Sequence, residues 1–182
     1  MDFKTPLTWP AGAENMGGYK NRIAFIPAAA VSAVPALVNT APTDDDDLVQ
    51  AVGSFTFITV GQKPMGIYCT DKTVKYGAEP QGELDAMSYA QAGEFFHPGN
   101  SKTMHAFNRQ AINTPGYLII EDPKGTQYMV GSEGMPCYIK PSFDGGAGRT
   151  DRRGTKYTFG ADSYCTAVEL ATPIDMDALF VV

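Results

Sequence analysis

The sequence has 182 residues, a mass of 19.5 kDa and a net charge of −6, from 14 basic and 20 acidic residues. This length predicts a single domain, 1–182, whose core is large enough to fold without disulfides or metal. The acidic balance makes the chain a poor candidate for wrapping duplex DNA, because such binding depends on Lys and Arg side chains that displace counterions from phosphates. The 19 glycines and 13 prolines predict many turns and short strands.

The three cysteines, Cys69, Cys137 and Cys165, lie far apart in the sequence and form neither a disulfide framework nor a CxxC metal motif. We expect them to act as small apolar residues in or near strands. The N-terminus lacks a basic segment followed by an apolar run, and no stretch reaches about 18 apolar residues. These features predict a protein that is synthesised in the cytoplasm and does not insert into membranes.

The first half of the chain predicts an arm followed by short strands. Residues 1–19 are rich in proline and glycine and predict an irregular N-terminal arm that contains Trp9. A polar loop around 40–49 follows the first strand. Alternating apolar positions predict strands at 20–27, 55–60, 65–69 and 72–76. Residues 82–96 fit either a strand or a helix, and the glycine and proline that flank them favour a strand.

One helix is predicted, Ser101–Asn113, with Asn100 or Ser101 as its N-cap. Its apolar residues recur at helical spacing and form one stripe that suits packing against a sheet. Strong β formers and turn residues then predict further strands at 117–121, 127–130, 135–140, 157–159 and 164–170. The pattern as a whole predicts an all-β fold over 20–170, a β-sandwich or barrel with one flanking α-helix and long loops, and a C-terminal tail at 171–182.

No arrangement of residues indicates catalysis. The two histidines, His97 and His105, lie in no nucleophile motif, and no serine stands in GxSxG. The aspartates at 44–47 lack the spacing of a calcium loop, and the glycine-rich loop at 144–154 lacks GxxxxGK[ST]. We therefore expect no enzyme, no catalytic residue, no cofactor and no metal. A structural or binding protein fits these features better.

Four segments carry a resemblance to a known family: NMGGY at 15–19, GEFFHPGNS at 93–101, NTPGYLIIED at 113–122 and DRRGTKYTFGADS at 151–163. Through them the chain resembles structural proteins of tailed bacteriophages of Bacteroidetes hosts, most of all their tail tube proteins. The resemblance spans most of the chain and includes no catalytic motif. It implies a tail-tube-like virion protein that assembles with itself into homohexameric rings. These rings stack into a tube that contacts other phage tail proteins and lets viral DNA pass without specific binding.

The resemblance also implies roles for particular residues. Six copies of a chain with charge −6 give −36, which suits a negatively lined conduit that repels DNA. Candidate lumen-facing acids are Glu83, Asp85 and Glu94, with the aspartates at 44–47 as an alternative set. Candidate inter-subunit contacts are Trp9, Tyr19, Asp44, Asp45, Asp46, Asp47, Arg149, Arg152 and Arg153.

Three alternatives remain open. One is another ring-forming phage component, either a tail terminator or a head–tail joining protein. Another is a ligand-binding β-sandwich, which would need a planar set of exposed aromatic side chains. The third is a hydrolase on a β scaffold, which would need His97 or His105 beside a carboxylate or a cysteine.

Overall fold

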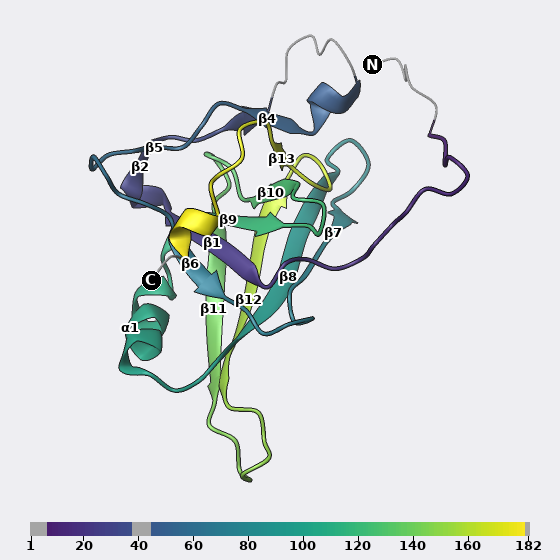
Figure 1. The fold of residues 1–182 in the computed structure, drawn as a ribbon. Helices are drawn as coiled ribbons and strands as arrows, with labels where there is room; N and C mark the ends of the chain where they lie inside the picture. Colours follow the sequence, from purple (N-terminus) through teal and green to yellow (C-terminus); the bar gives the residue numbers. More distant parts are fainter. Residues whose placement is uncertain (1–6, 38–44, 181–182) are drawn as a thin grey trace.

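The computed structural model describes residues 7–37 and 45–180, so Asp44 lies outside the described residues (Figure 1). The described chain is mostly β with one α-helix, which confirms the predicted fold class. Three 3-10 turns are present at Ala28–Ala30 (η1), Asp45–Leu48 (η2) and Asp177–Leu179 (η3). The helix and strands are β1 (Arg22–Pro27), β2 (Val31–Ala33), β3 (Ala36–Leu37), β4 (Gln50–Val52), β5 (Thr56–Phe57), β6 (Met65–Tyr68), β7 (Lys75–Gln81), β8 (Ser88–Pro98), α1 (Lys102–Ala111), β9 (Pro115–Glu121), β10 (Gln127–Val130), β11 (Cys137–Asp144), β12 (Gly154–Ser163) and β13 (Glu169–Leu170).

Eleven strands form one curled sheet, a half-barrel in which β9 is the central strand (Figure 1). β9 pairs with β1 on one side and with β10 on the other, and its first residues also pair with β11. The sheet continues from β11 through β12 and β8 to β7, and from β10 through β13 and β4 to β3. β6 pairs with β1, and β2 and β5 form a separate small sheet.

Hydrophobic cores lie on both faces of the central strands. In β1 the four residues Ile23–Ile26 are all buried, and in β9 every residue from Gly116 to Glu121 is buried. One core includes Phe25, Phe95 and Tyr157, and the other is built around Ile26 and other buried residues. A strand that is buried on both faces has a continuous apolar sequence, and this explains the run of apolar residues in β9.

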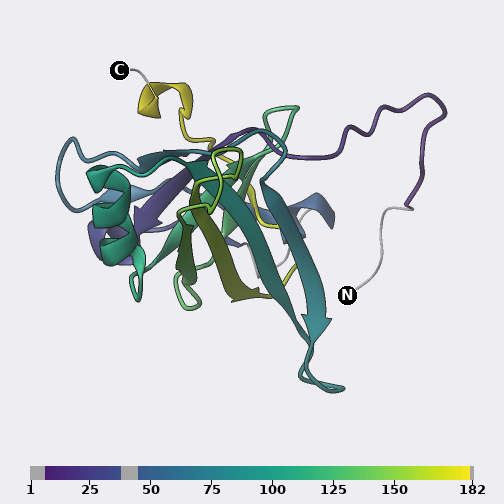
Figure 2. The same cartoon turned by 90° about the horizontal axis from the view of Figure 1, so that it is seen from below.

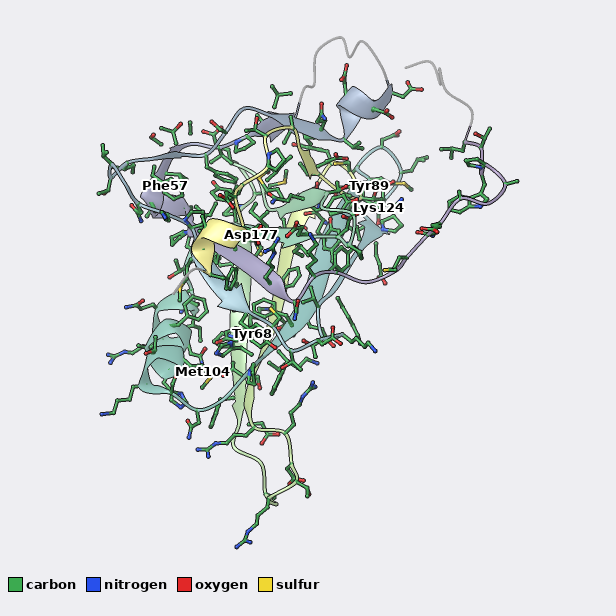
Figure 3. All side chains as sticks on the ribbon, in the orientation of Figure 1. Phe57, Tyr68, Tyr89, Met104, Lys124 and Asp177 are labelled. Atoms are coloured by element: carbon green, nitrogen blue, oxygen red, sulfur yellow. The ribbon has the colours of Figure 1, made fainter. Side chains whose placement is uncertain are left out.

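The helix forms where its capping residue and apolar stripe predict it. The Ser101 hydroxyl accepts a hydrogen bond from the Met104 backbone N–H at 3.1 Å, and Met104, Phe107 and Ala111 are buried. Figure 3 shows Met104 on the side of α1 that faces the sheet. The helix ends at Ala111, two residues before the predicted end, because Asn113 adopts a left-handed conformation with φ of 63°.

The strand predicted at 72–76 instead covers Lys75–Gln81, and three other predicted strands are also wrong in extent. Of 55–60, only Thr56 and Phe57 form a strand, and the side chains of Ile58 and Val60 are exposed. Of 164–170, only Glu169 and Leu170 are in a strand. Residues 82–87 form a turn, so the strand predicted at 82–96 begins at Ser88. Alternating apolar residues indicate that a strand would have one apolar face, but they do not show that a partner strand is available. These segments have no described partner strand over most of their length.

β11 and β12 are longer than predicted and form a hairpin that projects from the body (Figure 1). Their register runs from Tyr138 opposite Gly160 to Asp144 opposite Gly154, and the loop 145–153 closes the projecting end. β12 also pairs with β8 along its whole length, and β8 pairs with β7. The strands β7, β8, β12 and β11 lie side by side in this order and form one antiparallel ribbon. We call it the β7–β11 ribbon after its first and last strands.

Candidate functional site

The described part of the N-terminal arm is an extended segment that its own chain does not cover. All twelve residues from Leu7 to Gly18 are exposed, and the side chains of Trp9 and Met16 are 67% and 74% accessible. Its one hydrogen bond joins Ala13 N to Pro10 O within the arm, at 3.1 Å. Figures 1 and 2 show this segment leading away from the sheet. Large apolar side chains in this position gain stability only when a partner covers them.

The base of the arm, at Tyr19 and Lys20, contacts the body of the same chain. Tyr19 is half-buried, and its ring meets the Tyr76 ring edge-on, with 6.1 Å between the centroids. The Lys20 backbone N–H donates to the Glu121 carbonyl oxygen at 2.8 Å. Tyr19 therefore contacts its own chain at the base of the arm, and its predicted contact with another subunit stays a prediction.

Glu121 joins the base of the arm to the sheet and to the C-terminal turn. Its carboxylate lies 2.7 Å from Lys20 Nζ and 2.8 Å from Arg22 Nε. Arg22 also pairs with Asp177 of η3, which Figure 3 shows above β1. Burial of the Glu121 side chain raises its pKa, but the hydrogen bonds from Arg22 and Lys20 outweigh burial and hold the pKa below its ordinary value.

Replacing Glu121 by Gln is expected to lower the free energy of unfolding at pH 7 by about 3 kcal/mol, because Lys20 loses its carboxylate partner and Arg22 keeps only Asp177. The pKa of Glu121 is lower in the folded state, so its stabilisation is present above about pH 4.5 and is lost as the pH falls through the folded pKa. Urea unfolding at pH 7 and pH 3 checks this, with the exposed Glu133→Gln as control. An equal difference from wild type at both pH values would contradict it.

The β11–β12 hairpin presents arginines on a loop that is ordered by its own aspartates. The Asp151 carboxylate accepts hydrogen bonds from Gly148 N–H at 2.6 Å and Ala147 N–H at 3.0 Å, and these lower its pKa. The Arg152 guanidinium lies over the Phe96 ring, 4.3 Å from its centroid. The side chains of Arg149 and Arg153 form no hydrogen bond or ion pair with any residue in 7–37 or 45–180. The loop therefore offers two cations to a partner.

The structure does not bring the three candidate lumen-facing acids together. Glu94 lies on the outer face of β8, 2.6 Å from Lys156 Nζ and 3.4 Å from Lys75 Nζ. The hydrogen bond from Lys156 lowers its pKa. Glu83 and Asp85 lie in the turn that joins β7 to β8. Glu94 is six residues along β8 from Ser88, roughly 20 Å from that turn. A lumen-facing role for these acids stays a prediction.

The acidic loop lies far from the arginine loop. Asp45, Asp46 and Asp47 belong to η2, and Asp46 is exposed. Figure 1 places η2 at the opposite end of the molecule from the hairpin loop 145–153. Within one chain, the two sets of candidate contact residues therefore do not meet.

The histidines and cysteines have structural contacts. His97 Nδ1 lies 2.8 Å from the Tyr68 carbonyl oxygen, and His105 Nε2 lies 2.6 Å from Asn100 Oδ1. The cysteines are unpaired, and burial raises the pKa of both Cys69 and Cys137 to about 12. These thiols are protonated at neutral pH, so they are poor nucleophiles.

Nowhere in 7–37 or 45–180 do three His, Cys, Asp or Glu side chains gather as metal ligands would. In the same ranges no helix combines the length and apolar character that a membrane crossing needs.

Sequence reasoning missed two surfaces of the β7–β11 ribbon. One is an open groove of about 720 Å³ on its outer face, with Ala90, Ala92 and Gly160 among its lining residues and Tyr138 at one side. The other is the turn 82–87, where the side chain of Leu84 is 81% exposed. The signal for the groove is the row of small residues on neighbouring strands. The sequence does not predict this turn, because its pattern favours a single strand over 82–96.

Comparison of the chain with protein-family models, with curated proteins and with solved structures found no match in any of the three.

Proposed function

We propose that this chain is a virion structural protein that assembles with itself into stacked rings and forms the tail tube of a tailed bacteriophage. The observation that carries the proposal is the arm from Leu7 to Gly18, which is wholly exposed and bears Trp9 and Met16. A chain that leaves such a segment uncovered gains stability when a second copy covers it. The function is assembly, and the conduit for DNA is its product.

Two further features support assembly. β7 is an edge strand of the sheet, paired with β8 on one side and with no described strand on the other. An open edge offers unpaired N–H and C=O groups, and a strand of a neighbouring subunit can complete it. The projecting β11–β12 hairpin and the arm also extend the molecule in different directions (Figure 1), as subunits that reach several neighbours require.

The acidic net charge supports a conduit for DNA. A wall that attracts phosphates would retain DNA, and a net charge of −6 per copy disfavours retention. On the outer face of the β7–β11 ribbon, Glu94 lies between Lys75 and Lys156. These three residues carry a net charge of +1, so a negative lining would come from other acids of the chain.

The groove on the ribbon favours a second candidate, a ligand-binding module. Its volume of about 720 Å³ suits a small ligand, and Tyr138 supplies an aromatic side. One tyrosine does not form the planar aromatic platform that sugar binding requires, and the groove gives no account of the exposed arm. Assembly therefore remains the conclusion.

Negative-stain electron microscopy of the purified protein at several concentrations tests the proposal. We expect hollow tubes or stacked rings. Single rings that never stack would instead identify a tail terminator or a head–tail joining protein. Particles of monomer size at every concentration, confirmed by sedimentation, would contradict self-assembly and favour the ligand-binding candidate.

A further inference from the structure

Two exposed turns lie at opposite ends of the β7–β11 ribbon. At one end, Gly154 of β12 is opposite Pro98 of β8, and the loop 145–153 lies next to Gly154. At the other end, Gln81 of β7 is opposite Ser88 of β8, and the turn 82–87 joins these two residues. The eleven residues of β8 span the distance between them, roughly 35 Å. Figure 1 shows the two turns at opposite ends of the ribbon, so they cannot touch within one chain.

These turns carry opposite charge. The turn 82–87 contains Glu83 and Asp85 and no basic residue. The loop 145–153 contains three arginines and one aspartate, Asp151, whose carboxylate accepts two backbone N–H groups. Arginine guanidinium groups bind carboxylates in a paired, planar geometry, so each turn is a suitable partner for the other.

Exposed apolar side chains stand beside the acids. The side chains of Leu84 and Met87 are 81% and 67% accessible. A turn that faces only solvent gains no stability from two large apolar side chains. A turn that binds a protein buries them in the contact. This combination indicates a protein partner.

The acidic turn has a defined shape. Gly82 and Asp85 adopt left-handed conformations with φ of 98° and 69°, and Ala86 N–H donates to the Glu83 carbonyl oxygen at 3.0 Å. A Cβ atom on Gly82 would lie 2.4 Å from the Ala86 carbonyl oxygen, so only glycine fits there. A turn that is already ordered loses little conformational entropy when it binds.

We propose that the acidic turn 82–87 of one copy docks on the arginine loop 145–153 of a second copy. This inference rests on the proposed self-assembly and names one of its contacts. Because the two surfaces lie at opposite ends of the ribbon, the contact is head-to-tail and leaves a free turn at each end for the next copy. Arg149 and Arg153 pair with Glu83 and Asp85, while Leu84 and Met87 become covered.

The charges favour a second copy over nucleic acid as the partner of the arginine loop. Residues 144–153 hold three arginines and two aspartates, a net charge of +1. Affinity for duplex DNA grows with the number of phosphates that a protein neutralises, so a loop of this charge binds DNA weakly. The same loop has enough arginines for the two carboxylates of the acidic turn.

Charge reversal tests the contact. Glu83→Lys with Asp85→Lys, and separately Arg149→Glu with Arg153→Glu, are each expected to weaken self-association at least about tenfold at 0.1 M salt. Arg152 is left intact because it packs on Phe96. The variant with all four changes is expected to regain association, because its turns attract each other again. Sedimentation velocity and electron microscopy measure association. Matched controls reverse exposed charges elsewhere: Lys63→Glu with Lys124→Glu, and Asp71→Lys with Glu133→Lys.

The outcomes separate this contact from the proposed function. Wild-type protein that assembles, with both double variants assembling equally well, would overturn the contact and leave self-assembly intact. Failure of the fourfold variant to regain association would also overturn the contact. A loss of duplex DNA retention in Arg149→Glu with Arg153→Glu, with assembly unchanged, would assign the loop to phosphate instead. Wild-type protein that never associates would contradict the proposed function itself.

Discussion

Replacing Leu7, Trp9 and Met16 together by serine is expected to abolish assembly and leave the melting temperature of the subunit unchanged. These side chains are exposed along the described part of the arm, residues 7–18, which makes no hydrogen bond to the described body, so the fold does not depend on them. Apolar and aromatic anchors at protein interfaces contribute roughly 2 kcal/mol or more each when they are buried by a partner. Self-association should therefore weaken at least about a hundredfold.

Electron microscopy and sedimentation measure the loss of assembly, and circular dichroism measures the melting temperature. The matched control is Thr8→Ala with Asn15→Ala, which changes polar residues of the same arm and is expected to assemble as wild type does. Tubes of normal appearance from the serine variant would contradict the role of the arm. A clear fall in melting temperature would show that the arm packs on its own subunit.

Replacing Phe95 by Ala is expected to lower the free energy of unfolding by about 3–5 kcal/mol. The Phe95 side chain is 1% exposed and stacks on Tyr157, with 4.8 Å between ring centroids, and it also meets Phe159. Phe95 belongs to β8, and the two partner rings belong to β12. The removed ring leaves a cavity between two strands that carry the acidic turn and the arginine loop, so assembly is lost with stability.

The control for this prediction is Phe143→Ala, the same change on the projecting hairpin. Phe143 is 42% exposed and its ring contact is with His105, at 4.8 Å between centroids. We expect a loss of about 1 kcal/mol or less, because little buried contact disappears. Urea unfolding of both variants checks the difference. Similar losses for the two would show that the Phe95 cluster is not the centre of the ribbon.

The helix and the main strands could be predicted because their signals are local. Ser101 caps the next turn of the chain, and the apolar stripe of Met104, Phe107 and Ala111 repeats within ten residues. β9 is a run of strong β formers between turn residues. The same signals were present at 55–60, yet Ile58 and Val60 are exposed there, because alternation does not show whether a partner strand is available.

Local sequence thus determined the all-β class, the single described helix and the exposed arm around Trp9, since each depends on residues close together in the chain. The pairing of strands determined the rest. Glu121 meets Lys20 and Arg22 across 101 and 99 residues, and no local pattern links them. Likewise, Glu83 and Arg149 lie at opposite ends of one ribbon because β8 pairs with both β7 and β12. Strand register is set by long-range burial, which sequence periodicity alone does not encode.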